Sequence, residues 1–350
     1  MQTFSSGTTI YTGVNALQAL RTLCGERVLI VTDRFFSENG TARELASLCG
    51  GECRIFDRVQ PDPPLSLIAE GIAVIKEFCP DSIVALGGGS PIDCAKGILS
   101  LGSSDARLIA VPTTSGTGSE VTSFSILTHE GVKHPLIDEK LRPSAAILDP
   151  SLLEALPPKL IADSGMDVLS HCLEAIAAKN ASPFSDALAM CAFDSARRLL
   201  PKSFAGDTSV RQALHNAATM AGLAFDNAGL GACHALSHAI GGKFHLAHGR
   251  INGILLPHII QFNAETCPEP YHRLACFCGL SGIRALSAAI VRLRSVLQLP
   301  ESLTQAGVQS ADVLAAADEL CQAAQNDPCS RGNPRPVTSA DYLALLRQCL

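Results

Sequence analysis

The sequence predicts an α/β domain over residues 1–150, built on a Rossmann-like parallel sheet, followed by an all-helical domain over residues 151–350. In the first part, short apolar runs alternate with amphipathic segments, which is the pattern of βα units around a parallel sheet. From about residue 151 Ala and Leu dominate, β-branched runs disappear, and apolar residues recur at helical spacing. We place the boundary near Asp149–Pro150, where the last predicted strand ends.

Five short apolar runs are predicted to form the sheet, with helices between them. The first run, Arg27–Asp33, is rich in β-branched residues and ends in an acid, and a helical pattern over Asn39–Cys49 follows it. A proline-rich break precedes a second helical pattern, which runs from Leu65 to Pro80. The remaining strands are expected at Cys53–Arg58, Ser82–Leu86, Leu108–Val111 and Ala145–Leu148, which makes the run at Ser82 the third strand.

Long helices are expected in the second half at Lys159–Lys179, Pro183–Leu200 and Val210–Leu223. Each segment carries apolar residues at helical spacing and lacks β-branched runs. The second half is therefore predicted to contain no sheet.

The composition indicates large buried cores. Of the 350 residues 47% are hydrophobic and 17% are charged, against an average of roughly 25% charged in soluble domains. The formal net charge is −6 and no Lys/Arg-rich stretch is present, so the protein is not expected to bind nucleic acid. No apolar run approaches the roughly 18 residues that span a bilayer, so no membrane association is expected.

Fourteen cysteines suggest a disulfide framework or a thiolate metal site, but neither fits the sequence. No two cysteines form a CxxC pair. The first residues, Met1–Ser6, do not show the basic and apolar regions of a secretory signal. We therefore expect a reducing cytoplasm or an internal bacterial compartment, with the cysteines acting as small buried apolar residues.

Two loops rich in Gly, Ser and Thr each follow a predicted strand. In the first, Gly87–Ser90 lead directly into a helical pattern. Glycines allow close approach of a ligand to the backbone, and the free N–H groups of a helix N-terminus attract phosphate. The second loop, Thr113–Ser119, could supply more donors. Two such loops favour a pyrophosphate site over two simple tight turns.

The dinucleotide fingerprint GxGxxG is absent from the first βα turn, so the domain is not an ordinary Rossmann fold. Asp33 lies at the end of the first strong strand, where a carboxylate could accept hydrogen bonds from a ribose diol. It would also repel a 2′-phosphate, which favours NAD over NADP. A helix N-cap is an equally good interpretation of Asp33 from sequence alone.

Carboxylate and imidazole side chains cluster in the second half. Asp167 and His171 are four residues apart in a helical pattern, which places both on one face within reach of one cation. His234 and His238 have the same spacing. We expect the Gly241–Gly242 pair to break that helix, so that His248 can return to the same point. These residues predict a metal site.

Oxygen and imidazole ligands suit Fe(II), Zn(II), Co or Mn, and the sequence does not choose between iron and zinc. A divalent ion of this kind can act as a Lewis acid on an alcohol or carbonyl oxygen. Together with a pyrophosphate loop, this indicates hydride transfer between nicotinamide and an alcohol or aldehyde, in a cleft between the two halves.

These motifs resemble the iron-containing (group III) alcohol dehydrogenase family over essentially the whole chain. The resemblance rests on GGGSPIDCAK at 87–96, PTTSGTGSEVT at 112–122, AILDP at 146–150, GMDVLSHCLEA at 165–175 and the His-rich stretch at 234–249. Details at 61–63, 241–249 and 331–336 look most like the 1-propanol dehydrogenase branch of propanediol-utilisation microcompartments. The fold of the family, which it shares with dehydroquinate synthase, has an α/β dinucleotide domain and a helical metal domain.

The resemblance implies specific roles for residues of this chain. Asp167, His171, His234 and His248 would bind the metal, Fe2+ or else Zn2+. His238 is similar to a family histidine near the nicotinamide that relays a proton, a catalytic role. NAD(H) would be bound by Asp33, Gly88, Gly89, Ser90, Asp93, Thr113, Thr114, Ser119 and Lys133.

The implied reaction is reduction of a short-chain aldehyde by NADH, such as propionaldehyde to 1-propanol or acetaldehyde to ethanol, with NAD regenerated. A homodimer in the cytoplasm, inside a microcompartment with shell or enzyme partners, fits the same resemblance. Two alternatives stay open. One is a polyol dehydrogenase of the glycerol or 1,3-propanediol type on the same scaffold, and the other is a catalytically silent binding protein within a compartment.

Overall fold

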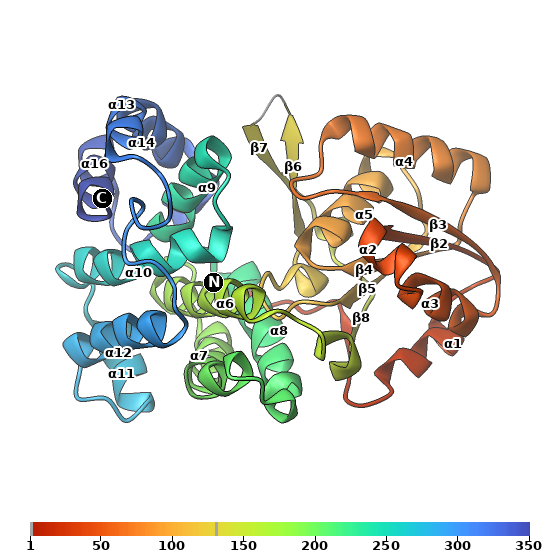
Figure 1. Ribbon diagram of the computed structural model, residues 1–350, viewed down its shortest axis with the longest axis horizontal. Helices are drawn as coiled ribbons and strands as arrows, with labels where there is room; N and C mark the ends of the chain where they lie inside the picture. The colour runs from red at the N-terminus through yellow and green to blue at the C-terminus, as the bar shows by residue number, and fades with distance from the viewer. Residues whose placement is uncertain (1–2, 130–131) are drawn as a thin grey trace. The chain divides into compact units, whose positions relative to one another are not determined.

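The computed structural model describes residues 3–129 and 132–350, which form two compact units (Figure 1). One unit comprises residues 6–156 and contains a six-stranded parallel sheet. The other comprises residues 157–350 together with residues 3–5 and is helical throughout its described part. The predicted fold class, an α/β domain followed by an all-helical one, is confirmed.

The parallel sheet has the strand order β1-β8-β5-β4-β2-β3. All five predicted strands are present, and the structure adds a strand that the sequence did not reveal, the four-residue β1 at the sheet edge. The glycine loop at 87–90 therefore follows the fourth strand, and the prediction that it follows the third was wrong. The strands are β1 (Thr9–Thr12), β2 (Arg27–Asp33), β3 (Glu52–Val59), β4 (Ser82–Gly87), β5 (Arg107–Pro112) and β8 (Ala145–Leu148).

Helices cover both faces of the sheet (Figure 1), which is why the central strands β4 and β5 carry the unbroken apolar runs Ile83–Leu86 and Leu108–Val111. Leu29 and Val31 of β2 face the core under α4 and α5, whereas Val28 and Ile30 face the core under α1 and α3. The helices of this unit are α1 (Leu20–Leu23), α2 (Arg34–Glu38), α3 (Thr41–Cys49), α4 (Leu65–Phe78) and α5 (Gly89–Leu101), with 3-10 turns at Ala16–Ala19, Ser119–Val121, Glu139–Leu141 and Pro150–Leu153.

A two-stranded antiparallel hairpin, β6 (Phe124–His129) and β7 (Val132–Ile137), follows the second loop and was not predicted. The fully buried Lys96 connects the hairpin to helix α5, which carries it. Its ammonium group donates to the carbonyl oxygens of Thr122 and Phe124, at 2.9 and 2.8 Å. A buried cation therefore holds the base of the hairpin.

The helical unit is built around α6, which packs against α7, α8 and α10. Nearly every residue of α6 from Ile161 onward is buried, so this helix lies in the interior. The three predicted helices are confirmed. The helices of this unit are α6 (Pro158–Ala177), α7 (Pro183–Phe204), α8 (Arg211–Ala228), α9 (Ala232–Phe244), α10 (His248–Ala264), α11 (Glu269–Phe277), α12 (Ile283–Val296), α13 (Ser310–Ala315), α14 (Ala317–Asn326), α15 (Pro328–Gly332) and α16 (Ser339–Gln348), with a 3-10 turn at Thr208–Val210.

One sequence expectation about this unit needs correction. Gly241–Gly242 do not break the helix: α9 continues to Phe244 and ends at His245, which adopts the left-handed conformation with φ of 55°. A glycine inside a helix costs only about 1 kcal/mol relative to alanine, and packing overrides this cost. No helix in the described chain is long and apolar enough to cross a membrane.

The cysteines are less uniform than expected. All fourteen are free thiols, but only six are buried. Five are half-buried and three are exposed, so the expectation that they all act as buried apolar residues was wrong. The exposed ones are Cys79, Cys191 and Cys276.

Gly87 provides a test of the loop after β4. Its φ is 147°, and a Cβ there would lie 2.4 Å from Cγ of Pro91. We expect Gly87→Ala to lower the free energy of unfolding by about 1–3 kcal/mol, because strain and overlap add. Urea unfolding followed by circular dichroism measures this. Gly242→Ala is the control. Gly242 lies within a helix and a Cβ there has open space, so the free energy of unfolding of this variant should rise slightly, because alanine favours the helix more than glycine does. Equal stabilities of Gly87→Ala and the parent would contradict the argument.

Candidate functional site

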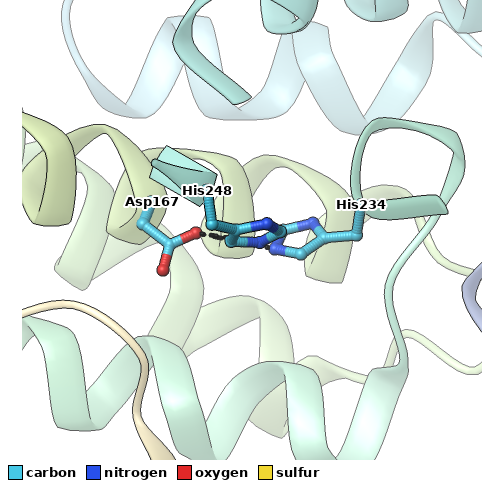
Figure 2. Close-up of side chains that lie close together, drawn as sticks. All are labelled: Asp167, His234 and His248. Atoms are coloured by element: carbon cyan, nitrogen blue, oxygen red, sulfur yellow. Dashed lines mark ion pairs between the residues drawn. The ribbon is translucent and has the colours of Figure 1, made fainter. Parts of the chain in front are cut away.

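The carboxylate of Asp167 is the centre of a cluster of imidazoles in the helical unit (Figure 2). Its Oδ1 atom lies 3.7 Å from Nε2 of His171, 3.8 Å from Nε2 of His234 and 3.5 Å from Nε2 of His248. These side chains come from α6, α9 and the first residue of α10. Residues as far as 81 positions apart in the sequence, Asp167 and His248, therefore meet at one carboxylate oxygen.

The spacing of the ligand atoms suits a single cation. Asp167, His234 and His248 each offer an atom within 4.8 Å of the other two. Metal–ligand bonds of about 2.0–2.2 Å in a tetrahedral arrangement place the ligand atoms ~3.3 Å apart, close to the observed separations. The donor set, one oxygen with imidazole nitrogens, fits Fe2+ or Zn2+.

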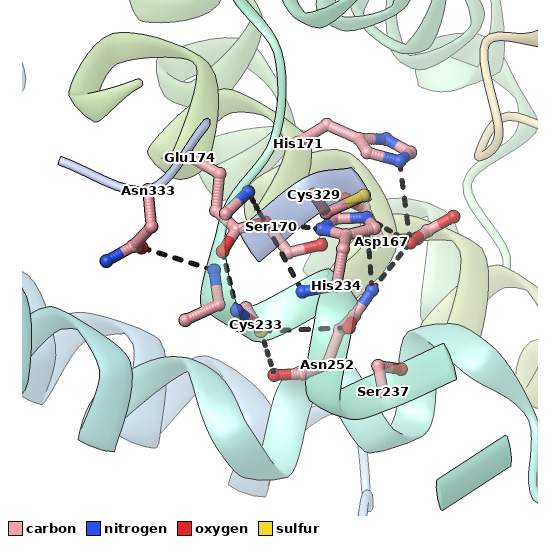
Figure 3. A network of polar contacts seen from close by, with 12 residues as sticks. Asp167, Ser170, His171, Glu174, Cys233, His234, Ser237, Asn252, Cys329 and Asn333 are labelled. Atoms are coloured by element: carbon pink, nitrogen blue, oxygen red, sulfur yellow. Dashed lines mark hydrogen bonds and ion pairs between the residues drawn. The ribbon is translucent and has the colours of Figure 1, made fainter. Parts of the chain in front are cut away.

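The outer ring nitrogens of two histidines are held by hydrogen bonds, so that their Nε2 atoms face the cluster. Figure 3 shows His234 and its partner Glu174. Nδ1 of His234 is 2.6 Å from Glu174 Oε2, and Nδ1 of His248 is 3.0 Å from Ser237 Oγ. Metal-binding histidines are normally fixed in this manner through the nitrogen that does not touch the metal.

His171 is held differently. Its ring stacks between Phe225 and His234, with centroid separations of 4.3 and 4.8 Å, while its buried Nδ1 has no hydrogen-bond partner in the described structure. Its ring plane is therefore fixed by packing. Its Nε2 faces Asp167, and its part as a fourth ligand stays a prediction.

Glu174 and Asn252 are residues of the cluster that sequence reasoning missed. Asn252 Nδ2 donates to Asp167 Oδ1 at 2.9 Å and lies 3.1 Å from Nε2 of His248. Both had a signal in the sequence: Glu174 is seven residues after Asp167, and Asn252 is four after His248, so each lies on the helix face that carries a ligand.

The approach of α10 to α6 depends on Gly249. A Cβ at this position would lie 1.8 Å from the carbonyl oxygen of Asp163, so only glycine fits. The next residue, Arg250, makes a two-pronged ion pair with the Asp163 carboxylate, at 3.1 and 2.8 Å. These contacts set His248 beside Asp167.

Charge is unevenly distributed over the cluster. Burial opposes ionisation of Asp167, but attraction to the imidazoles outweighs it and holds the pKa of the carboxyl well below its usual range. Burial lowers the pKa of His171 to about 4. Burial also acts against the charged form of His234, but the nearby Asp167 carboxylate and the hydrogen bond to Glu174 raise its pKa to about 9. At neutral pH Asp167 is therefore a carboxylate, His171 is neutral and His234 is an imidazolium.

His238, the predicted proton carrier, lies beside this cluster. Its ring stacks on His248 at 5.2 Å, and its Nδ1 is 2.9 Å from Asp327 Oδ2. Burial works against ionisation of Asp327, but the hydrogen bond with His238 lowers its pKa, so it remains a carboxylate. Asp327 caps the short helix α15, and no spacing in the sequence linked it to His238.

In the α/β unit, Asp33 and the two glycine-containing loops lie at the carboxyl edge of the sheet. Asp33, Gly87 and Pro112 end three neighbouring strands, β2, β4 and β5. From β2 the chain proceeds to β3 on one side, and from β4 to β5 on the other, so a topological switch point lies between β2 and β4. Open α/β sheets bind their ligands at such points.

The two glycine-containing loops lie against each other. A Cβ on Gly88 would lie 3.2 Å from Oγ1 of Thr114, and one on Gly89 would lie 2.9 Å from Cγ2 of Thr117. The surfaces of Gly88, Gly89 and Ser90 are partly exposed at this edge. The structure thus brings together the loop backbones that were predicted to bind pyrophosphate.

Other predicted nucleotide-binding residues have partners within the protein. Asp93 accepts hydrogen bonds from Ser119 Oγ at 2.7 Å and from the backbone of Ile126 at 3.2 Å. Lys133 forms an ion pair with Asp62 at 2.7 Å. Asp33 accepts from the backbone N–H of Phe36 and so caps α2, while Thr113 is buried. Their direct contacts with NAD(H) stay predictions.

Comparison with known families covers nearly the whole chain. A model described as iron-containing alcohol dehydrogenase matches residues 7–150, and one described as Fe-containing alcohol dehydrogenase family, C-terminal, matches residues 161–350. The chain belongs to the iron-containing alcohol dehydrogenase family. Its members act on alcohols and aldehydes with a divalent metal and NAD(P), so this chain is an enzyme of that kind.

Individual relatives span the full chain. It is 37% identical over 370 residues to the 1-propanol dehydrogenase PduQ of Salmonella typhimurium, covering 100% of both. It is 34% identical over 382 residues to an NADPH-dependent butanol dehydrogenase of Clostridium saccharobutylicum, covering 100% of this chain and 98% of the relative. A solved structure of 1,3-propanediol oxidoreductase matches with a TM-score of 0.94 at 32% identity, covering 100% of both chains.

The protonated state of His234 leads to a pH prediction. A cation at the cluster must displace the proton of His234, whereas His171 is already neutral. We expect the apparent Kd for Co2+ to fall about tenfold per pH unit from about pH 7 until the pH reaches about 9, and then to level off. Titration of the metal-free protein followed by visible absorbance measures it. Glu174→Gln should flatten the dependence, because it removes a group that raises the pKa of His234. An affinity of the parent that does not change over this range would contradict the prediction.

Proposed function

We propose that this enzyme reduces short-chain aldehydes to primary alcohols with NADH, with propionaldehyde or acetaldehyde as substrate, and so regenerates NAD. The observation that carries the proposal is the convergence of three imidazole Nε2 atoms on the buried Asp167 carboxylate. The full-length similarity to a 1-propanol dehydrogenase supports the substrate class.

Each ligand has a distinct task in this proposal. Asp167 supplies negative charge, while His171, His234 and His248 supply neutral nitrogens. Glu174 and Ser237 orient two of the rings. The ion they hold would act as a Lewis acid that polarises a carbonyl oxygen, and the nicotinamide would supply the hydride.

His238 is proposed to provide the proton that completes the alcohol. In the neutral ring, Nδ1–H donates to the Asp327 carboxylate, which leaves Nε2 to exchange a proton with substrate or water. When the ring takes up a proton, the nearby carboxylate stabilises the imidazolium. Asp327 is thus a positioning residue for His238.

We propose NAD(H) over NADP(H). Asp33 lies at the end of β2, beside the switch point, and its negative charge disfavours a 2′-phosphate. The Oδ1 atom that caps α2 leaves the second carboxylate oxygen for a ribose hydroxyl. The NADPH dependence of the butanol dehydrogenase relative makes this choice a point for experiment.

A polyol dehydrogenase is the second candidate, because the solved 1,3-propanediol oxidoreductase shares the fold over the full chain. A homodimer inside a bacterial microcompartment, in the cytoplasm, stays part of the proposal and is supported by the similarity to PduQ.

Replacement of His248 tests the metal centre. We expect His248→Ala to lose bound metal and at least about a hundredfold of activity, because it removes a ligand while α10 stays packed through Gly249 and Arg250. Anaerobic purification, metal analysis and circular dichroism provide the readouts. The matched control is His245→Asn, an exposed histidine three residues away whose left-handed conformation asparagine tolerates. A folded, metal-free and fully active His248→Ala variant would refute the metal assignment.

A substrate panel tests the chemistry. With anaerobically prepared enzyme, NADH oxidation against two- to four-carbon aldehydes should exceed NADPH oxidation by at least about tenfold, because of the Asp33 charge. kcat/KM for 1-propanol should exceed that for glycerol or 1,3-propanediol in the reverse direction. Higher values for the polyols would favour the second candidate, and cofactor binding without any turnover would indicate a binding protein.

A further inference from the structure

A second group of ligand-type side chains lies beside the first in the helical unit. It consists of His238 on α9 with Asp327 and Cys329 at the start of α15. Each offers one ligand atom, and the three atoms lie within 4.8 Å of one another. The side chains of His238 and Asp327 are 22% and 16% exposed, so an ion from solvent can reach two of the three ligands directly. None of them belongs to the group formed by Asp167, His234 and His248.

We propose that His238, Asp327 and Cys329 form a second metal site, which takes a divalent cation with affinity for nitrogen and sulfur, such as Zn2+. The donor set carries this choice. One imidazole, one carboxylate and one thiolate are the three ligand types that zinc combines in proteins. The first centre offers oxygen and nitrogen only, so thiolate ligation distinguishes the two sites.

The arrangement is already close to that of a bound ion. His238 Nδ1 and Asp327 Oδ2 are 2.9 Å apart and share a proton. Two ligand atoms on a tetrahedral zinc ion are ~3.3 Å apart, so an ion could replace this proton after a shift of a few tenths of an ångström. Binding through Nδ1 moves the ring proton of His238 to Nε2 and releases the Cys329 thiol proton to solvent, so that the Asp327 carboxylate and the Cys329 thiolate supply two negative charges to balance the cation.

The carboxylate and imidazole ligands are held in position by the chain itself. Asp327 Oδ1 accepts a hydrogen bond from the backbone N–H of Cys329 at 2.8 Å, which turns Oδ2 toward His238. On the other side, the ring of His238 stacks on that of His248 at 5.2 Å. The carboxylate of Asp327 and the ring of His238 are therefore positioned before any ion arrives.

Occupation of the second site has a consequence for turnover, and this part rests on the proposed function. An ion bound to His238 replaces the proton between His238 and Asp327 and fixes the ring. The proposed proton exchange at His238 would then stop, although the ligands of the first centre remain free to hold their metal. We therefore expect Zn2+ to inhibit the enzyme without removing the first metal.

Cadmium absorbance tests the site directly. The enzyme with its first centre loaded is titrated anaerobically with Cd2+, and the thiolate-to-cadmium charge-transfer absorbance in the ultraviolet is recorded. The expected result is one equivalent of this absorbance that Cys329→Ser loses, that Zn2+ competes away, and that Cys191→Ser retains. Cys191 is exposed on α7 and serves as the matched control. An unchanged titration of Cys329→Ser would overturn the proposal.

A second variant covers the case in which Cys329→Ser folds poorly. Asp327→Asn keeps the shape of the side chain but removes its charge, and it should weaken Cd2+ binding at least about tenfold. Circular dichroism checks the fold of both variants. Cadmium binding by Asp327→Asn that equals binding by the parent would overturn the proposal.

Inhibition separates the site from the proposed function. The Zn2+ concentration for half-inhibition, measured relative to the zinc-free activity of each protein, should rise at least about tenfold in Cys329→Ser. If cadmium binds through Cys329 but Zn2+ does not inhibit the parent, the second site stands and the role of His238 in turnover is overturned. If the cadmium absorbance is missing while the aldehyde reductase activity is present, the site is overturned and the proposed function stands.

Discussion

A single buried carboxylate organises the helical unit. Asp167 lies in the interior helix α6, where an ionised group is costly unless charges and hydrogen bonds surround it. The Nε2 atoms of His171, His234 and His248 and the amide of Asn252 provide that surrounding. Because these groups come from α6, α9 and α10, the arrangement of the three helices and the charge state of the carboxylate depend on each other.

Glu174, which contacts the ligand His234, has both a structural and a chemical role. The Glu174 carboxylate orients the ring of His234 and also accepts hydrogen bonds from the backbone N–H groups of Gly231 and Cys233, at 3.0 and 2.6 Å. These are free donors at the beginning of α9. One group therefore caps the helix, fixes the tautomer of a ligand and raises its pKa. These hydrogen bonds explain why the Glu174 carboxylate is stable in the interior of the helical unit.

The α/β unit relies on a different constraint. Parallel strands in register bring their carboxyl ends to one edge, so the loops after β4 and β5 meet there. Glycine allows the loop after β4 to turn and to approach Thr114 and Thr117 closely. The buried ammonium group of Lys96 donates a hydrogen bond to Ser119 and so holds the second loop against α5, the helix that begins in the first loop.

Local patterns in the sequence determined the fold class, five of the six strands of the sheet, the interior helices and the four-residue spacings of Asp167 with His171 and of His234 with His238. Tertiary structure decided the rest. The edge strand β1 is too short to show a period, and the turn that returns His248 lies at His245 because packing kept Gly241 and Gly242 helical. The pairing of His238 with Asp327 spans 89 residues. The spacing of residues shows only which side chains share a face of one helix or strand. The contact between His238 and Asp327 depends on the packing of α9 against α15, which no spacing in the sequence reveals.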